Sequence, residues 1–193
     1  NLKTDNVTSM SYTFYYCSSL TSLNLSSFNT ENVDNMAAMF YGCSSLSSLD
    51  LSSFNTSKVT NMTYMFSGCP ALKMINVSSF NTENVVNMAG MFYGCSSLYG
   101  VGLSSFNTSK VTDMAYMFRG CSAIKMLNVS SFNTENVTDM RFLFNNCANL
   151  TTIYCNDDWN TSTVQYSDSM FDGCTSLVGA VAYDASKTDV TMA

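Results

Sequence analysis

Hydrophobic and polar residues recur along this chain with a period of 26 residues. The cysteines mark this period, with one 27-residue step at the end: Cys17, Cys43, Cys69, Cys95, Cys121, Cys147 and Cys174. A fixed period between about 20 and 50 residues is typical of a solenoid, in which each unit buries its apolar side by stacking on its neighbours. The pattern therefore predicts a single repeat domain over residues 1–193.

The repeats divide this domain into three parts. Residues 1–27 form a partial first unit, residues 28–155 the regular repeats, and residues 156–193 an irregular last unit with a C-terminal cap. No signal-like segment is present at Asn1, so we expect the sequence to be a fragment of a longer protein.

Each unit predicts one strand. Leu49 and Leu51 alternate with the polar residues Ser48 and Asp50, which is the period of a half-buried strand. Because equivalent residues recur at the same step, stacking the units places these strands side by side in a parallel sheet.

A short helix is predicted after each strand. Asn35 suits a helix start, Gly42 suits a helix stop, and Met36, Met39 and Phe40 between them have the i, i+3, i+4 spacing of a buried helix face. Tyr16 replaces glycine in the first unit, which we expect to fray or to end differently. The expected fold is an α/β solenoid of about seven 26-residue coils, with one parallel strand and one short helix per coil.

Composition excludes several functions. Only 11% of residues are charged and the net charge is −6, which argues against a nucleic-acid partner. No apolar run is long enough to span a bilayer, so this chain is not expected to insert directly into a membrane. The sequence contains no histidine, which removes Ser-His-Asp and Cys-His nucleophile systems and histidine metal sites. We therefore expect no enzyme activity, no catalytic residues and no cofactor.

The sulfur-containing residues are interpreted as core. The methionines fall mainly in two repeat columns, where flexible side chains fill a core. No Cys-x-x-Cys pair occurs, so we expect free buried thiols and no metal site. Cys155 occupies a strand position and is expected to behave as a small hydrophobic residue.

Two polar columns accompany the core. The asparagines are expected to bond both their own turn and the next coil: Asn29, Asn55, Asn81, Asn107, Asn133 and Asn160. The adjacent threonine column, which includes Thr30 and Thr82, allows a third and weaker hypothesis of a flat ice-binding or mineral-binding face.

Candidate ligand-binding residues lie on two surfaces. On the predicted helix side they are tyrosines: Tyr12, Tyr41, Tyr64, Tyr93 and Tyr116. On the outer side of the strands they are Met74, Met126 and Tyr154. Tyrosines on a rigid surface bind proteins and sugars at low entropic cost. The alternation of Tyr64 with Gly90 is equally typical of packing between coils, so both interpretations stay open.

The last unit departs from the repeat at Asp157-Asp158-Trp159. One interpretation is a widened turn whose indole covers the last coil. The other is a carbohydrate or calcium site that uses the two carboxylates beside an aromatic ring.

The repeat resembles a known family. The unit Met-Phe-x-Gly-Cys-Ser-Ser-Leu-x-x-Leu-x-Leu-Ser-Ser-Phe-Asn-Thr-x-x-Val-x-x-Met at 39–62 is similar to the 26-residue BspA-like leucine-rich repeat of bacterial surface proteins and lipoproteins. The tail from Leu177 resembles the segment that closes such arrays.

This resemblance implies a right-handed leucine-rich-repeat-like stack and an extracellular location on the bacterial cell surface. It also implies a non-enzymatic adhesin-type binding module whose partner is a host or microbial surface protein or glycan. The alternative is a passive structural spacer that presents another domain. The motif consists of fold positions, so the resemblance assigns no binding residue.

Overall fold

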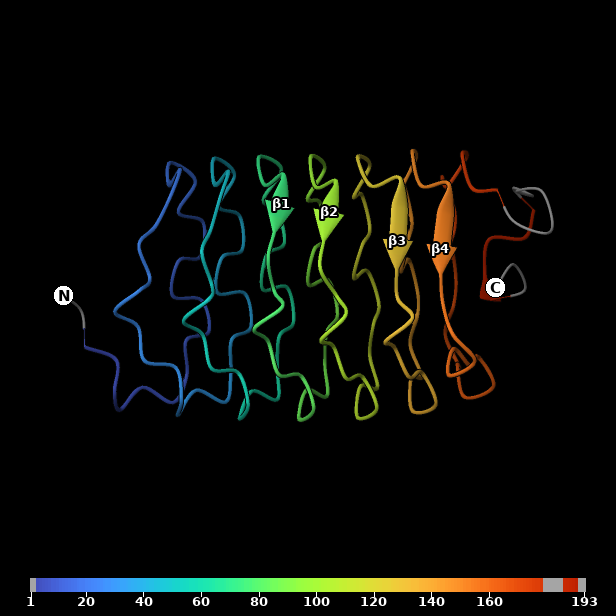
Figure 1. Cartoon of the computed structure of the whole chain (residues 1–193). Coiled ribbons are helices and arrows are strands. Elements are labelled where there is room, and N and C mark those ends of the chain that lie inside the picture. Colours follow the sequence, from blue (N-terminus) through green and yellow to red (C-terminus); the bar gives the residue numbers. More distant parts are fainter. Residues whose placement is uncertain (1–2, 179–185, 191–193) are drawn as a thin grey trace.

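The computed structural model describes residues 3–178 and 186–190. Successive coils of the chain lie side by side along one axis (Figure 1). A continuous line of parallel bridges joins one residue from each coil to the next: Ser9, Asn35, Asn61, Asn87, Asp113, Asp139 and Tyr166. Residues 26 positions apart are therefore neighbours in space, as the sequence period predicts.

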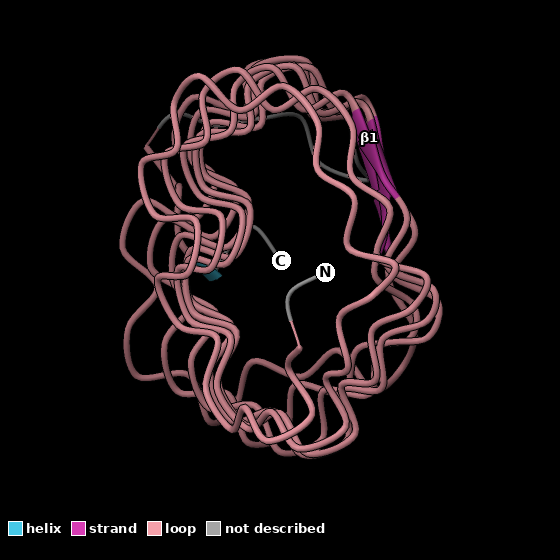
Figure 2. Cartoon of the chain, turned by 90° about the vertical axis from the view of Figure 1, so that its left-hand side faces the viewer, coloured by secondary structure: helices cyan, strands magenta, loops and turns pink. Residues whose placement is uncertain are grey.

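Four short strands lie on one side of the coils, where the first is labelled in the end view (Figure 2): β1 (Met74–Ile75), β2 (Gly100–Val101), β3 (Met126–Asn128) and β4 (Thr152–Tyr154). β1 pairs with β2 and β3 with β4, both in parallel register. The predicted parallel pairing is confirmed within these two pairs, but the expected continuous sheet is wrong, because β2 and β3 are not paired. The expectation of one strand in every coil is wrong, because the equivalent residues of the first two coils, 22–25 and 48–51, form no strand.

The helix predicted in each coil is wrong. No α-helix is present among the described residues, and the segment 35–43 and its equivalents are runs of tight turns. Met39 N–H donates to the carbonyl of Met36 (3.3 Å), whereas Phe40 N–H donates to the carbonyl of Met65 in the next coil (2.9 Å). An α-helix directs every such N–H to the carbonyl four residues earlier. In the stack, every second N–H of this segment donates to a carbonyl of the next coil, so the hydrogen bonds of an α-helix cannot form.

The residues expected to begin and end the helix stabilise the turns instead. Asn61 Oδ1 accepts a hydrogen bond from Thr63 N–H (2.9 Å), two residues further on. Gly42 has a φ of 72°, in the left-handed region that glycine tolerates. Tyr16 adopts the same conformation with a φ of 54°, and its N–H donates to the carbonyl of Tyr41. The expectation that the first coil ends differently is therefore wrong.

Aromatic rings form a continuous column through the core. Phe40 and Phe66 stack with centroids 5.7 Å apart and planes 3° apart, and Phe66 stacks on Phe92 at the same distance. Met36 and Met39 are fully buried beside this column, as the core interpretation predicts. Like side chains from successive coils thus pack directly on one another, which is the packing that a repeat core requires.

The cysteines are free thiols, and six are buried: Cys43, Cys69, Cys95, Cys121, Cys147 and Cys174. The Sγ of Cys95 donates to the carbonyl of Phe66 in the preceding coil (3.1 Å). Burial raises the pKa of Cys95 to about 12, so its reactive thiolate form is scarce near neutral pH. Cys17 is exposed in the first coil. Cys155 is exposed as well, because the repeat pattern breaks after Tyr154, and the expectation that it packs as a core residue is wrong.

The threonine column is buried, which contradicts the ice-binding or mineral-binding hypothesis. Thr30, Thr56 and Thr82 are at most 1% exposed, so they present no face to a surface. The asparagine side chains bond their own turns as expected, and that of Asn29 also bonds a neighbouring coil, where its Nδ2 donates to Asp5 Oδ1 (3.3 Å). Asn81 Oδ1 accepts from Glu83 N–H within its own turn (3.0 Å), while the link between coils joins the backbone of the asparagines to the threonine hydroxyls.

The C-terminal end of the stack is covered. Phe171 N–H donates to the carbonyl of Thr188 (2.8 Å), a bond that inner coils make to the next coil, and Val190 packs against the core. Residues 186–190 therefore cap the last coil, and the remainder of the predicted cap, at 179–185 and 191–193, lies outside the described residues. Trp159 stacks on Phe144 with centroids 6.4 Å apart, which fits the interpretation of a widened turn covered by the indole.

Candidate functional site

Exposed apolar side chains gather on the outer side of the strands. Met74, Tyr99 and Met126 are 58%, 57% and 62% exposed and come from three successive coils. Lys73 and Lys125 flank them and are exposed. We call the set Lys73, Met74, Tyr99, Gly100, Lys125 and Met126 the strand-face patch. Large exposed apolar groups on a surface otherwise rich in Ser, Thr and Asn mark a candidate interaction site.

The strands position this patch. Met74 and Gly100 are directly paired across β1 and β2, and Tyr99 N–H donates to the carbonyl of Lys73 (2.9 Å). Side chains of a strand alternate between its two faces, so Met74 points outward while Ile75 is buried. In the earlier coils the positions equivalent to Met74 hold Ser22 and Ser48. The fold therefore does not require the exposed methionines.

A hollow lies beside the patch where glycines leave the surface uncovered. A Cβ placed on Gly100 would lie 3.7 Å from Met74 Cγ, and a Cβ on Gly102 would have no atom within 4 Å. The hollow next to Gly102 has a volume of about 180 Å³ and is also lined by Asn128 and Ser130. This hollow lies between the coils that carry β2 and β3, beside the strand-face patch, and can admit a side chain from a partner.

Tyr154 is exposed, as expected for a candidate ligand-binding residue. It ends β4 and pairs with Asn128 across β3 and β4. It therefore lies on the same side of the stack as the strand-face patch, one coil beyond Met126.

The predicted tyrosines lie on another segment of each coil, in the runs of turns. We call Tyr12, Tyr15, Tyr16, Tyr41, Tyr64, Tyr93 and Tyr116 the tyrosine face. Neighbouring rings touch along it, as in the pairs Tyr15–Tyr41 (5.1 Å) and Tyr41–Tyr64 (6.2 Å). The structure thus brings the tyrosines together but keeps them on a segment distinct from that of Met74 and Met126.

Much of the tyrosine face packs against the protein itself. The ring of Tyr64 lies over Gly90, where an added Cβ would be 2.1 Å from the ring. Arg119 places its guanidinium over the rings of Tyr93 (5.6 Å) and Tyr116 (5.7 Å). Burial raises the pKa of Tyr64, which accords with a half-buried phenol. The alternation of large and small residues is therefore explained by packing between coils, whereas Tyr12 remains exposed.

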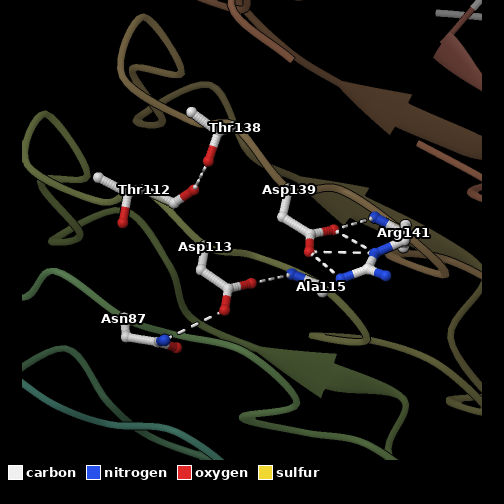
Figure 3. A network of polar contacts seen from close by, with 7 residues as sticks. All are labelled: Asn87, Thr112, Asp113, Ala115, Thr138, Asp139 and Arg141. Atoms are coloured by element: carbon white, nitrogen blue, oxygen red, sulfur yellow. Dashed lines mark hydrogen bonds and ion pairs between the residues drawn. The ribbon is translucent and has the colours of Figure 1, made fainter. Parts of the chain in front are cut away.

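A polar network lies at the start of the turn runs (Figure 3). Asp113 accepts hydrogen bonds from Asn87 Nδ2 (3.1 Å) and from Ala115 N–H (3.0 Å). Asp139 on the next coil holds the guanidinium of Arg141, whose Nε lies 3.0 Å from Asp139 Oδ1. Burial raises the pKa of Asp113, with a further contribution from the charge of Asp139. All the groups in the network are engaged with one another, so we assign it a structural role.

Sequence analysis missed Tyr99, Lys73 and Lys125. A signal was present, because Lys-Met occurs at 73–74 and 125–126 and Tyr-Gly stands between them at 99–100. The pattern becomes visible only when the outer residues of each unit are aligned as columns.

The described residues contain neither a grouped metal-ligand set nor a membrane-spanning helix. Among residues 3–178 and 186–190, no group of three or more Cys, Asp or Glu side chains is arranged to hold a metal ion. No helix within the same residues has the length and apolar character needed to cross a membrane.

Comparison with known proteins identifies a family and a distant similarity to solved structures. The family described as "Mycoplasma protein of unknown function, DUF285" matches residues 1–98 and 69–183. A leucine-rich repeat protein from Bacteroides ovatus, known from a crystal structure, is 15% identical, with a TM-score of 0.23. This match covers 86% of this chain and 68% of that one. No curated protein matches the chain.

Proposed function

Because the chain belongs to the DUF285 family, whose matches span residues 1–183, and carries an exposed apolar patch on the strand side of its stacked coils, we propose that it is a non-enzymatic binding module. The module engages a protein or glycan on a host or microbial surface, and its own location is the bacterial cell surface. Both points follow from the likeness of its repeat to the BspA-like leucine-rich repeat, as does our assignment of the stack to a right-handed solenoid of that type.

The single observation that carries this proposal is the strand-face patch. Met74, Tyr99 and Met126 expose apolar surface that packing does not explain, since Ser48 and Ser47 fill the equivalent positions of the second coil. Apolar groups on a stiff scaffold lose little freedom when a ligand covers them, which favours binding. The tyrosine face is the weaker candidate because its rings already contact one another and Arg119.

The test replaces the patch with residues that the fold already accepts. A variant carrying Met74→Ser, Tyr99→Ser and Met126→Ser takes its residues from the equivalent positions Ser48 and Ser47. The control is Tyr12→Ala, which alters an exposed tyrosine to the residue found at the equivalent Ala38. Each protein is applied to arrays of surface proteins and glycans, and affinities are measured by surface plasmon resonance.

We expect the patch variant to lose binding and Tyr12→Ala to retain it. The opposite result would move the site to the tyrosine face. If the parent chain binds nothing on either array at high micromolar concentration, the binding function is wrong and the spacer alternative replaces it. A spacer also requires that deletion of two coils, such as residues 28–79, shortens reach and leaves attachment unchanged.

A further inference from the structure

Lys73, Tyr99 and Lys125 form one column across three coils of the strand-face patch. They occupy equivalent positions 26 residues apart, and the backbone bond from Tyr99 N–H to the Lys73 carbonyl shows that the first two are direct neighbours. Paired strands lie about 4.8 Å apart, so Lys73 and Tyr99 lie close together, whereas Lys125 belongs to the next coil, whose strand β3 is not paired with β2. The coils before and after the exposed aromatic ring therefore each carry a cation.

This part of the surface is positive although the chain is negative. The segments 73–76, 99–102, 125–128 and 151–154 contain two lysines and no Asp or Glu, whereas the whole chain has a net charge of −6. Elsewhere Lys58 and Lys110 donate to Asn32 and Asn84, and Arg141 pairs with Asp139. Within the described residues, the ammonium groups of Lys73 and Lys125 make no ion pair or hydrogen bond. Both charges are free to meet an anionic partner.

The apolar part of the patch lies directly beside these cations. Met74 is paired with Gly100 and its Cγ lies over that glycine, while Met126 stands on the following coil. Methionine is flexible and polarizable, so it adapts to aliphatic and aromatic side chains of different shapes. The hollow at Gly102 extends this surface along the coil.

We infer that the strand-face patch binds an acidic polypeptide segment whose aliphatic or aromatic side chains pack against the exposed Met74 and Met126, with carboxylates at Lys73 and Lys125. This inference rests on the proposed binding function and specifies its partner. A neutral glycan would leave both lysines unused, and an anionic polysaccharide offers no apolar side chain for the methionines. A peptide with both features matches the whole patch.

The test uses synthetic peptides in which acidic residues flank a Leu or Phe. Matched peptides replace the acidic residues with Gln or Lys, or replace the apolar residue with Ser, and a sulfated polysaccharide is the second kind of probe. Binding to the full chain is measured by fluorescence anisotropy over a range of salt concentrations. The variants are Lys73→Ser, Lys125→Ser and the pair Met74→Ser with Met126→Ser.

We expect only the acidic peptides with an apolar residue to bind well. Each lysine variant weakens their binding by about two- to fivefold at low salt and reduces its dependence on salt. The methionine variant weakens binding further and leaves the salt dependence unchanged, because burial of apolar surface is not screened. Circular dichroism and thermal melting confirm that the variants fold.

Other outcomes separate this inference from the proposed function. Preferred binding of Gln or Lys peptides, or of the polysaccharide, through the same patch would overturn the acidic-peptide inference while the binding function stands. Equal salt dependence in the lysine variants and the parent chain would also overturn it. If no peptide binds while a glycan on the array does, the inferred acidic-peptide partner is wrong and the proposed binding function stands.

Discussion

Thr82 and Asn107 are joined across adjacent coils by two reciprocal hydrogen bonds. The hydroxyl of Thr82 donates to the carbonyl of Asn107 (2.9 Å) and accepts from the N–H of the same residue (2.8 Å). One side chain thus satisfies both backbone groups of a residue 25 positions away. The same pair recurs at Thr30 with Asn55 and at Thr56 with Asn81, so these hydroxyls act as links along the whole stack.

Replacing Thr82 with Val should destabilise the stack by about 1–3 kcal/mol, because the N–H and carbonyl of Asn107 both lose the hydroxyl that bonds them. Thr82→Ser keeps the hydroxyl and should cost less. Urea unfolding followed by circular dichroism measures the difference. Thr60→Val on the surface is the control, and an equal loss in the control and in Thr82→Val would contradict the assigned role.

Gly90 and Tyr64 should show strong energetic coupling. Gly90→Ala places a Cβ against the Tyr64 ring and should lower stability by more than the about 1–2 kcal/mol of a left-handed alanine. Ala38 has a φ of 53° in the equivalent position, so the backbone itself accepts alanine. In a Tyr64→Ala background the cost of Gly90→Ala should fall. A double-mutant cycle from thermal or urea unfolding measures the coupling. If Gly90→Ala lowers the free energy of unfolding equally with and without the Tyr64 ring, the two residues are not coupled by packing.

Asp113→Asn should raise stability at neutral pH. Burial raises the pKa of Asp113 above its unfolded value of about 3.9, so the native state holds this proton more tightly than the unfolded state does. The stabilising contribution is complete below that unfolded value and is lost as pH rises through the raised native pKa. Near pH 7 the buried carboxylate is therefore unfavourable, and asparagine, which stands at the equivalent Asn87, is better accommodated.

The pH dependence of unfolding separates this effect from a general change in packing. The gain from Asp113→Asn should shrink as the pH is lowered to about 3, where the carboxyl group is protonated in both states. Asp139→Asn is the matched control one coil away. It leaves Arg141 without its carboxylate and should destabilise the protein at neutral pH. A gain that is constant with pH would contradict the assignment.

Thiol reactivity should divide the cysteines into two classes. Cys17 and Cys155 are exposed and should react at once with an aromatic disulfide reagent, whereas the buried six should react only after unfolding. Burial raises the pKa of Cys43 to about 11 and that of Cys174 to about 12, which suppresses their thiolates further. Absorbance titration with and without denaturant counts both classes. Rapid labelling of Cys95 in the native protein would contradict the stacked core.

The sequence pointed to two candidate surfaces, the tyrosine face and the outer side of the strands. The structure explains much of the first by packing and leaves the second exposed. In the sequence, the alternation of Tyr64 with Gly90 is compatible with a binding surface or with packing between coils. The structure favours packing, because the Tyr64 ring lies over Gly90. Met74 and Met126 were identified because they lie on the outer side of the predicted strands. Tyr99 and the lysines were missed, since each looks ordinary until the three coils are placed side by side.

The 26-residue period by itself determined which residues are neighbours. A repeated sequence that stacks on itself must place Phe40 on Phe66 and Cys69 next to Cys95, and the core follows from that translation. Only the tertiary structure decided the local backbone. The spacing of Met36, Met39 and Phe40 suits a helix, but in the stack every second amide, such as that of Phe40, bonds to the next coil instead of its own. Local spacing cannot reveal this choice, because the competing carbonyl lies 25 residues further along the chain.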